Sequence, residues 1–138
     1  MNIAAGARKV IFMATMTGGI RREDVPRFTI GGGKIHIDKE GNSKKFVNEI
    51  EQISCNAKMN IDIGKTVIYI TERAVFHMTE DGLELIEIAP GVDLNKDVLE
   101  VMEFKPLISK NLREMPSGIF KEHWGELKDI LDAKQKET

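Results

Sequence analysis

The residues best suited to chemistry lie in a short polar loop near the start of the chain. The loop combines a threonine, two glycines and two arginines: Thr17, Gly18, Gly19, Arg21 and Arg22. Glycine amides and guanidinium groups suit phosphate oxygens, and open α/β sheets place ligands at the carboxyl ends of their strands. Because the loop follows an apolar run, the predicted binding residues are Thr17, Gly18, Gly19 and Arg21. A tight turn followed by solvated charges is the alternative.

The other reactive residue types form no recognisable site. Cys55 is the only cysteine, and no His or basic residue adjoins it, so we expect a small packed residue rather than a nucleophile. Glu72 and Arg73 form a charged pair at the end of a predicted strand, where a structural ion pair is favoured over a catalytic one. The three histidines lie far apart in unrelated patterns: His36, His77 and His123. We therefore predict no metal site.

Composition bounds the class of protein. The chain has 138 residues, of which 41% are hydrophobic, and this suits one compact domain. Lys and Arg number 20 against 22 Asp and Glu, so no overall field recruits nucleic acid or an anionic membrane. Residues 1–20 are apolar only in short pieces and include Arg8 and Lys9, which predicts neither a secretion signal nor a membrane span. With a single cysteine, the expected location is the reducing cytoplasm.

The first half of the chain predicts strands. Lys9–Met16 contains an unbroken apolar run that glycines end, which favours a central strand covered on both faces over a short buried helix. From Phe28 to Val47, period-two alternation broken by Gly and Asn predicts a small antiparallel meander. Its triple glycine, residues 31–33, predicts a hairpin turn rather than a phosphate loop, because no Lys-Ser or Lys-Thr follows. Ile50–Cys55 is a candidate for a further strand.

The second half predicts strands followed by helices. Three β-rich runs lie between Thr66 and Ala89, and Glu80-Asp81-Gly82 forms the turn between the last two. Asp93 stands at the N-cap of a helix. The predicted buried face of that helix is Leu94, Val98, Val101 and Met102. A last helix, from about Ile119 to Lys134, places five apolar residues on one stripe: Phe120, Trp124, Leu127, Ile130 and Leu131.

The same segments carry a family resemblance. Its strongest part consists of Tyr69–Phe76, Asp81–Leu83 and Leu85–Leu94. Further matching stretches occur in the same order: Lys9–Phe12, Lys44–Val47, Glu51–Ile53, Lys96–Leu99 and Phe104–Ser109. Over residues 1–120 the chain resembles the C-terminal part of the acyl-CoA:acetate, propionate and 3-oxoacid (acetoacetate) CoA-transferases. Residues 121–138 are predicted to form a C-terminal amphipathic helix and tail outside this resemblance.

The resemblance implies an α/β fold, part of an open CoA-transferase-type sheet with a small antiparallel β meander and C-terminal helices. Enzymes of this family have two homologous halves with the active site between them, and the chain resembles the end of the second, beta-type half. They move CoA from an acyl-CoA to a short-chain carboxylate through a glutamyl-CoA thioester. Coenzyme A is then a substrate, no cofactor is implied, and the loop at Thr17 would contact CoA phosphates.

The family's nucleophile lies in a Glu-x-Gly motif upstream of the region seen here. Glu80-Asp81-Gly82 has that spacing but matches a hairpin turn, so we predict no catalytic residue in this chain and no activity without the missing N-terminal or alpha-type part. Met13–Thr17 also departs from the Cys-Gly-Thr that relatives often carry. The alternative is a non-catalytic binding or assembly module, which uses the stripe at Trp124 to dock a partner or itself.

Overall fold

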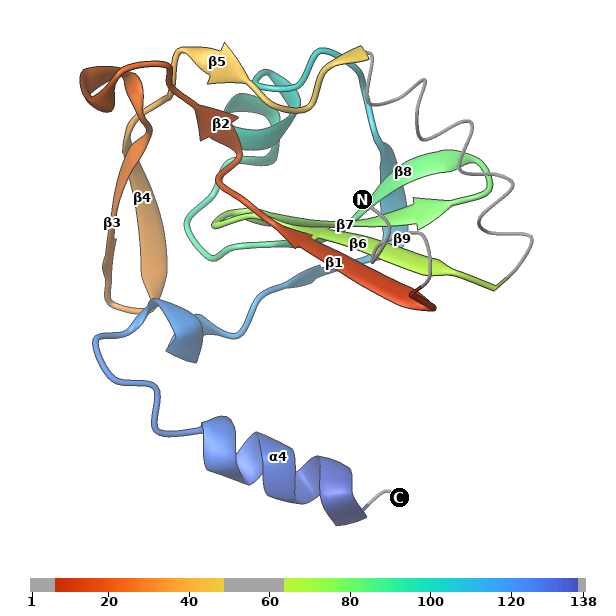
Figure 1. Cartoon of the computed structure of the whole chain (residues 1–138). Helices are drawn as coiled ribbons and strands as arrows, with labels where there is room; N and C mark the ends of the chain where they lie inside the picture. The colour runs from red at the N-terminus through yellow and green to blue at the C-terminus, as the bar shows by residue number, and fades with distance from the viewer. Residues whose placement is uncertain (1–6, 49–63, 137–138) are drawn as a thin grey trace.

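A five-stranded mixed sheet is the frame of the molecule (Figure 1). The computed structural model describes residues 7–48 and 64–136. In spatial order the strands are β1 (Lys9–Met13), β6 (Thr66–Ile70), β7 (Ala74–Thr79), β8 (Gly82–Ile88) and β9 (Leu107–Glu114). β1 runs parallel to β6 and β9 runs parallel to β8, whereas β6, β7 and β8 are antiparallel. Segments from both ends of the described chain thus meet in one sheet.

The three strands predicted between Thr66 and Ala89 are present as β6, β7 and β8. Their β-branched and aromatic residues favour extended backbone, and the side chains of β7 alternate between buried and half-buried. Glu80 and Asp81 are exposed in the turn between β7 and β8, where Thr79 pairs with Gly82. The predicted hairpin is therefore confirmed.

β1 forms as predicted but lies at the edge of the sheet. Of the described strands only β6 pairs with it, and Phe12 and Met13 are 46% and 77% exposed. The prediction of a central strand covered on both faces is therefore wrong for the described residues. An apolar run indicates what a strand is suited to contact, whereas its burial depends on neighbours that this part of the chain does not supply.

A separate hairpin, β3 (Arg27–Gly31) and β4 (Lys34–Lys39), stands beside the sheet (Figure 1). Gly32 and Gly33 have φ angles of +61° and +77°, which suit the central residues of a tight hairpin turn. The turn predicted from the triple glycine is therefore confirmed. A small core cluster attaches the hairpin to the rest of the molecule: Ile35, Ala89, Met115 and Phe120.

The predicted meander ends after this hairpin. β5 (Ser43–Lys44) pairs with β2 (Thr17–Gly18) as a second small antiparallel sheet. Phe46, which we expected in a strand, is a buried loop residue whose ring centroid lies 4.8 Å from that of Phe76. That part of the prediction is wrong because core packing, and not a strand ladder, holds Phe46. The candidate strand Ile50–Cys55 lies outside the described residues.

The main core lies between one face of the sheet and the segments that contain Met16, Phe46, Val98 and Met102. It consists of nine buried residues: Met16, Phe46, Ala74, Phe76, Met78, Leu83, Leu85, Val98 and Met102. Tyr69 borders this core, and its ring stacks on Phe12 of the neighbouring strand at 5.2 Å between centroids. Burial raises the pKa of Tyr69 above its ordinary value of 10.0. The aromatic side chains thus join β1 to the sheet and the core.

The helix predicted after Asp93 begins as expected in η2 (Leu94–Leu99), a short π-helix, but it ends before the predicted residues Val101 and Met102. The Asp93 side chain accepts a hydrogen bond from the Lys96 amide at 2.9 Å, which confirms the predicted N-cap. Val98 and Met102 are buried as predicted, whereas the other two predicted core positions are half-buried. η2 covers the same side of the sheet as β2 and β5 (Figure 1).

The sequence does not predict β9. Its residues alternate poorly, since Lys110, Asn111 and Arg113 interrupt the apolar positions. The strand nevertheless pairs with β8 at both of its ends, with an irregularity in register between them. Tertiary pairing therefore overrides a weak local preference here.

The predicted C-terminal helix differs most from the structure. Residues 119–134 form the end of η3 (Ser117–Phe120), a connecting segment, and most of α4 (Leu127–Lys136). Trp124 lies in the connection against Gly118, where an added Cβ would be 2.4 Å from the indole ring. This contact divides the predicted stripe, so that its first residue is buried while Leu131 is 51% exposed. Figure 1 shows α4 lying away from the five-stranded sheet.

Two phenylalanines test this architecture. Phe76 is fully buried in β7, whereas Phe12 is about half exposed on β1. We expect Phe76→Ala to lower the free energy of unfolding by about 3–5 kcal/mol, because it empties a core position. Phe12→Ala should cost no more than about 1.5 kcal/mol, the size of a lost aromatic contact. Urea unfolding followed by circular dichroism measures both values, and equal losses would contradict the edge position of β1.

Candidate functional site

Two short segments form the base of the candidate site. One is the loop from Ala14 to Gly19 that follows β1, and the other is the turn from Glu40 to Lys45 that follows β4. β2 and β5 pair within these segments. Gly41 allows their backbones to approach closely, because a Cβ added there would lie 2.2 Å from the carbonyl oxygen of Gly18. The two segments therefore act as one unit.

Arg73, in the turn between β6 and β7, is the buried cation beneath this unit. Its side chain is fully buried, and its guanidinium forms ion pairs with Glu40 and Glu72. Nε donates to the Glu72 carboxylate at 2.8 Å, and Nη1 donates to the main-chain carbonyl of Asp97 at 3.0 Å. Nη2 lies 2.8 Å from the same Glu72 oxygen without hydrogen-bond geometry. One side chain thus joins the β4–β5 turn, the β6–β7 turn and η2.

The carboxylates of Glu40 and Glu72, besides pairing with Arg73, also bind the loop after β1. Glu72 accepts a hydrogen bond from the Met16 amide at 2.7 Å, and Glu40 accepts one from the Thr17 hydroxyl at 3.0 Å. The Thr17 oxygen in turn accepts from the Gly41 amide at 2.9 Å. This chain of partners fixes the path of the loop, so Glu72 and Arg73 have the structural role that the sequence favours.

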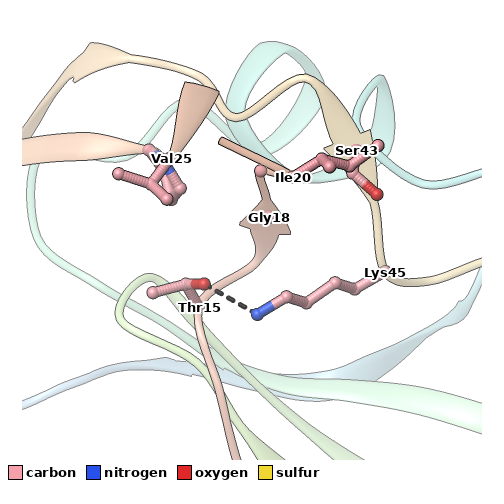
Figure 2. Close-up of a pocket in the computed structure, with 8 residues that line it drawn as sticks. Thr15, Gly18, Ile20, Val25, Ser43 and Lys45 are labelled. Carbon is pink, nitrogen blue, oxygen red and sulfur yellow. Dashed lines mark hydrogen bonds between the residues drawn. The ribbon is translucent and has the colours of Figure 1, made fainter. Parts of the chain in front are cut away.

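A pocket of about 410 Å³ opens beside the loop (Figure 2). One part of its lining is polar or backbone: Thr15, Gly18, Gly19, Ser43 and Lys45. The remainder of the lining is apolar: Ile20, Val25 and Pro26. Figure 2 shows the Lys45 side chain extending toward Thr15, whose hydroxyl accepts a hydrogen bond from the ammonium at 2.9 Å. A pocket of this size, with one polar end, suits part of a small ligand.

The structure separates the four predicted binding residues. Gly18 and Gly19 line the pocket. Thr17 is buried, and its hydroxyl donates a hydrogen bond to Glu40 and accepts one from the Gly41 amide. Arg21 is exposed and does not line the pocket. Of the four residues, only the glycines face the cavity, and their contact with a ligand stays a prediction.

Lys45, the cation in the pocket lining, was not predicted from the sequence. Lys45 lines the pocket, whereas the adjacent Lys44 is exposed and donates to the main-chain carbonyl of Glu100 at 3.0 Å. No local pattern distinguishes two adjacent lysines. The pairing of Lys44 with Thr17 determines which of them turns toward the pocket, and that pairing joins segments more than twenty residues apart.

Among residues that the structure describes, the other reactive side chains do not gather into a second site. Within residues 7–48 and 64–136, no group of three His, Cys, Asp or Glu side chains could hold a metal ion. Glu80 lies exposed in its hairpin, without the buried surroundings of a nucleophile, and Cys55 lies outside the described residues. In the described part of the chain no helix is long and apolar enough to cross a membrane.

Comparison with known proteins finds CoA-transferases among the relatives of this chain. No family model matches the chain. The acetate CoA-transferase YdiF of Escherichia coli O157:H7 is 46% identical over 120 residues, which cover 87% of this chain and 22% of that protein. The caffeate CoA-transferase of Acetobacterium woodii is 40% identical over 131 residues, which cover 95% of this chain and 24% of that protein. The chain therefore spans less than a quarter of the length of these relatives.

Solved structures agree with the sequence matches. The apoenzyme of the acyl-CoA transferase YdiF from Escherichia coli O157:H7 has a TM-score of 0.77 and 45% identity, covering 88% of this chain and 22% of that one. Its thioester complex with CoA has a TM-score of 0.74 and 41% identity, covering 88% and 23%. Over most of its length the chain therefore resembles part of the acyl-CoA transferases, and the predicted α/β class is confirmed.

The buried ion network makes a prediction about stability. We expect Arg73→Met to lower the free energy of unfolding by about 3 kcal/mol or more, because it leaves two carboxylates without their cation. Arg113→Met is the matched control, since Arg113 pairs with Glu87 on the surface and is 68% exposed. The control should lose no more than about 1 kcal/mol. Chemical denaturation of both variants measures the difference, and losses of equal size would show that the Arg73 network does not hold the fold.

Proposed function

We propose that this chain is the C-terminal part of the second half of an acyl-CoA transferase. The complete enzyme would move CoA from an acyl-CoA to a short-chain carboxylate through a glutamyl-CoA thioester, with the catalytic glutamate outside this chain. The observation that carries the proposal is the 46% identity of 87% of the chain to an acetate CoA-transferase. The two relatives are named for different carboxylic acids, acetate and caffeate, which supports a carboxylate acceptor as the common feature.

The open edge of the sheet supports a requirement for further polypeptide. β1 is apolar, yet among the described strands it has a neighbour on one side only, and Ile11, Phe12 and Met13 are all exposed. Proteins generally protect exposed edge strands, because unpaired amides and carbonyls invite pairing with another chain. A strand contributed by the remainder of the enzyme would satisfy this edge. We propose that the N-terminal or alpha-type part supplies that strand.

Three glutamates of the described residues, Glu40, Glu72 and Glu80, are poorly placed to act as the nucleophile. A carboxylate nucleophile must be free to attack an acyl-CoA and form a covalent intermediate. Glu40 and Glu72 are held by Arg73 and by the loop after β1. Glu80 has the Glu-x-Gly spacing but lies in an exposed turn. These observations support a nucleophile supplied from outside this chain.

The pocket beside the loop supports a role in binding CoA or the acid. Gly18 and Gly19 expose backbone at its wall, and Lys45 contributes a positive charge. A cytoplasmic location completes the proposal, since the chain contains one cysteine and acyl-CoA chemistry needs no oxidising compartment.

A chimeric enzyme tests the proposed function. The segment of YdiF that matches this chain would be replaced by residues 1–138, and CoA transfer from acetyl-CoA to propionate would be measured. We expect the chimera to be active and the isolated chain to be inactive, because only the chimera contains the nucleophile. After reaction with acyl-CoA, mass spectrometry should locate the glutamyl-CoA adduct in the YdiF-derived part.

The controls separate folding from function. A chimera that carries Glu80→Gln should keep its activity, since Glu80 is not proposed to take part. A folded but inactive chimera, or robust activity of the isolated chain, would overturn the proposal. An adduct on a glutamate of this chain would overturn the assignment of the nucleophile.

A non-catalytic assembly module is the second candidate, and α4 favours it. Leu127 and Leu131 are 45% and 51% exposed on this helix. The match to the caffeate enzyme covers 131 of the 138 residues, so it includes at least residues 8–131 and thus the first part of α4. If the α4 stripe mediates self-association, Leu131→Glu should convert an oligomer into a monomer in sedimentation. A wild-type chain that is already monomeric would exclude self-association.

A further inference from the structure

Lys45 is a partly buried cation that no carboxylate among residues 7–48 and 64–136 neutralises. Its ammonium makes a hydrogen bond to the uncharged hydroxyl of Thr15 at 2.9 Å. Arg73 and Arg113 form ion pairs with carboxylates, whereas Lys45 forms none with the described residues. Removing a charge from water without a partner is unfavourable. A partly buried ammonium in a pocket is therefore suited to receive an anion.

The surrounding structure fixes the position of this ammonium. The Thr15 hydroxyl donates to the carbonyl of Thr17 at 2.7 Å, so its oxygen lone pairs face Lys45. The backbone of Lys45 lies between β5, which is paired to β2, and Phe46, which is buried in the main core. Both flanking residues are thus held in place. The ammonium is positioned before any ligand binds, which reduces the entropy lost on binding.

Gly18 provides the space for the Lys45 side chain. A Cβ added to Gly18 would lie 3.0 Å from Cε of Lys45, closer than such contacts normally occur. The glycine therefore leaves room for this path of the lysine side chain, besides exposing backbone amides to a ligand. This links the glycine predicted from sequence to a cation that the sequence did not single out.

We propose that the Lys45 ammonium is the anion-binding group of this pocket and binds an oxyanion of the substrates. An ammonium has three donors, of which Thr15 uses one, so two remain for oxyanion oxygens. Either a CoA phosphate or the carboxylate of the acid offers this chemistry. The apolar side of the pocket, formed by Ile20, Val25 and Pro26, would contact the uncharged part of the same ligand. Only this choice of ligands rests on the proposed function.

The adjacent lysine provides the matched control. Lys44 is exposed and donates to a main-chain carbonyl, outside the pocket lining. Lys45→Met and Lys45→Gln remove the pocket charge, whereas Lys44→Met removes an equal charge one residue away. The isolated chain would be titrated with adenosine 3′,5′-bisphosphate and, separately, with propionate. Binding is read from amide nitrogen and proton chemical shifts, with Thr15, Gly18 and Gly19 as reporters.

We expect one of the two ligands to shift the reporter amides, and the Lys45 variants to bind it about 10- to 100-fold more weakly, as the loss of a charged hydrogen bond implies. Lys44→Met should bind like the wild type. Shifts with the bisphosphate assign the site to CoA, and shifts with propionate assign it to the acid. Wild-type titrations that leave the reporter amides unmoved, or equal effects of the Lys44 and Lys45 variants, would overturn the proposal.

The titration and the chimera assay can fail independently, so failure of the anion site can be told apart from failure of the proposed function. Lys45-dependent binding by the isolated chain together with a folded, inactive chimera would retain the anion site and reject the transferase role. An active chimera whose activity is unchanged by Lys45→Met, together with unmoved reporter amides, would do the reverse.

Discussion

The rest of the structure depends on one buried cation, Arg73. A buried arginine needs partners for its charge, and here they come from three segments of the chain: Glu40, the adjacent Glu72 and the carbonyl of Asp97. The two carboxylates then bind the amide of Met16 and the hydroxyl of Thr17. The sheet, η2 and the loop beside the pocket are therefore joined through a single charge. The π-helical turn of η2 brings the Asp97 carbonyl into this network, in keeping with the frequent occurrence of such turns at functional sites.

This network explains how an exposed loop keeps a defined shape. The loop after β1 has two residues in a strand ladder, and Gly41 brings its partner segment to within van der Waals contact of Gly18. The Met16 amide and the Thr17 hydroxyl point inward, toward Glu72 and Glu40, whereas Thr15 and the two glycines line the pocket. Lys45 then lies over Gly18, and none of the described carboxylates pairs with its charge. The polar groups on the buried side of the loop thus have hydrogen-bond partners, while the pocket side is open to a ligand.

The sheet has the opposite character at its β1 edge. There an apolar strand is exposed on both faces, although its Phe12 ring stacks on Tyr69. An apolar strand that pairs with a described neighbour on one side only is typical of a sheet that continues in another part of a protein. This agrees with a chain that spans less than a quarter of its relatives, and it connects the fold directly to the proposed dependence on another part of the enzyme.

Local signals predicted most of the strands and turns, because their causes are local. The β-branched runs between Thr66 and Ala89, the turn at Gly32 and Gly33, and the cap at Asp93 all follow from backbone preferences of the residues present. The errors arise where tertiary contacts decide. Whether Lys44 or Lys45 faces the pocket, and whether Trp124 continues a helix or packs on Gly118, depends on segments brought together by the fold.

The candidate site was predicted only in part for the same reason. The sequence located the loop but could not show that Thr17 points inward to Glu40 while Lys45 enters from a neighbouring segment. The most direct test of the account is a crystal structure of the YdiF chimera trapped as its thioester with CoA. We predict a thioester on a glutamate of the YdiF-derived part and substrate atoms in contact with the loop after β1. A thioester on Glu40, Glu72 or Glu80, or a ligand bound far from this loop, would contradict it.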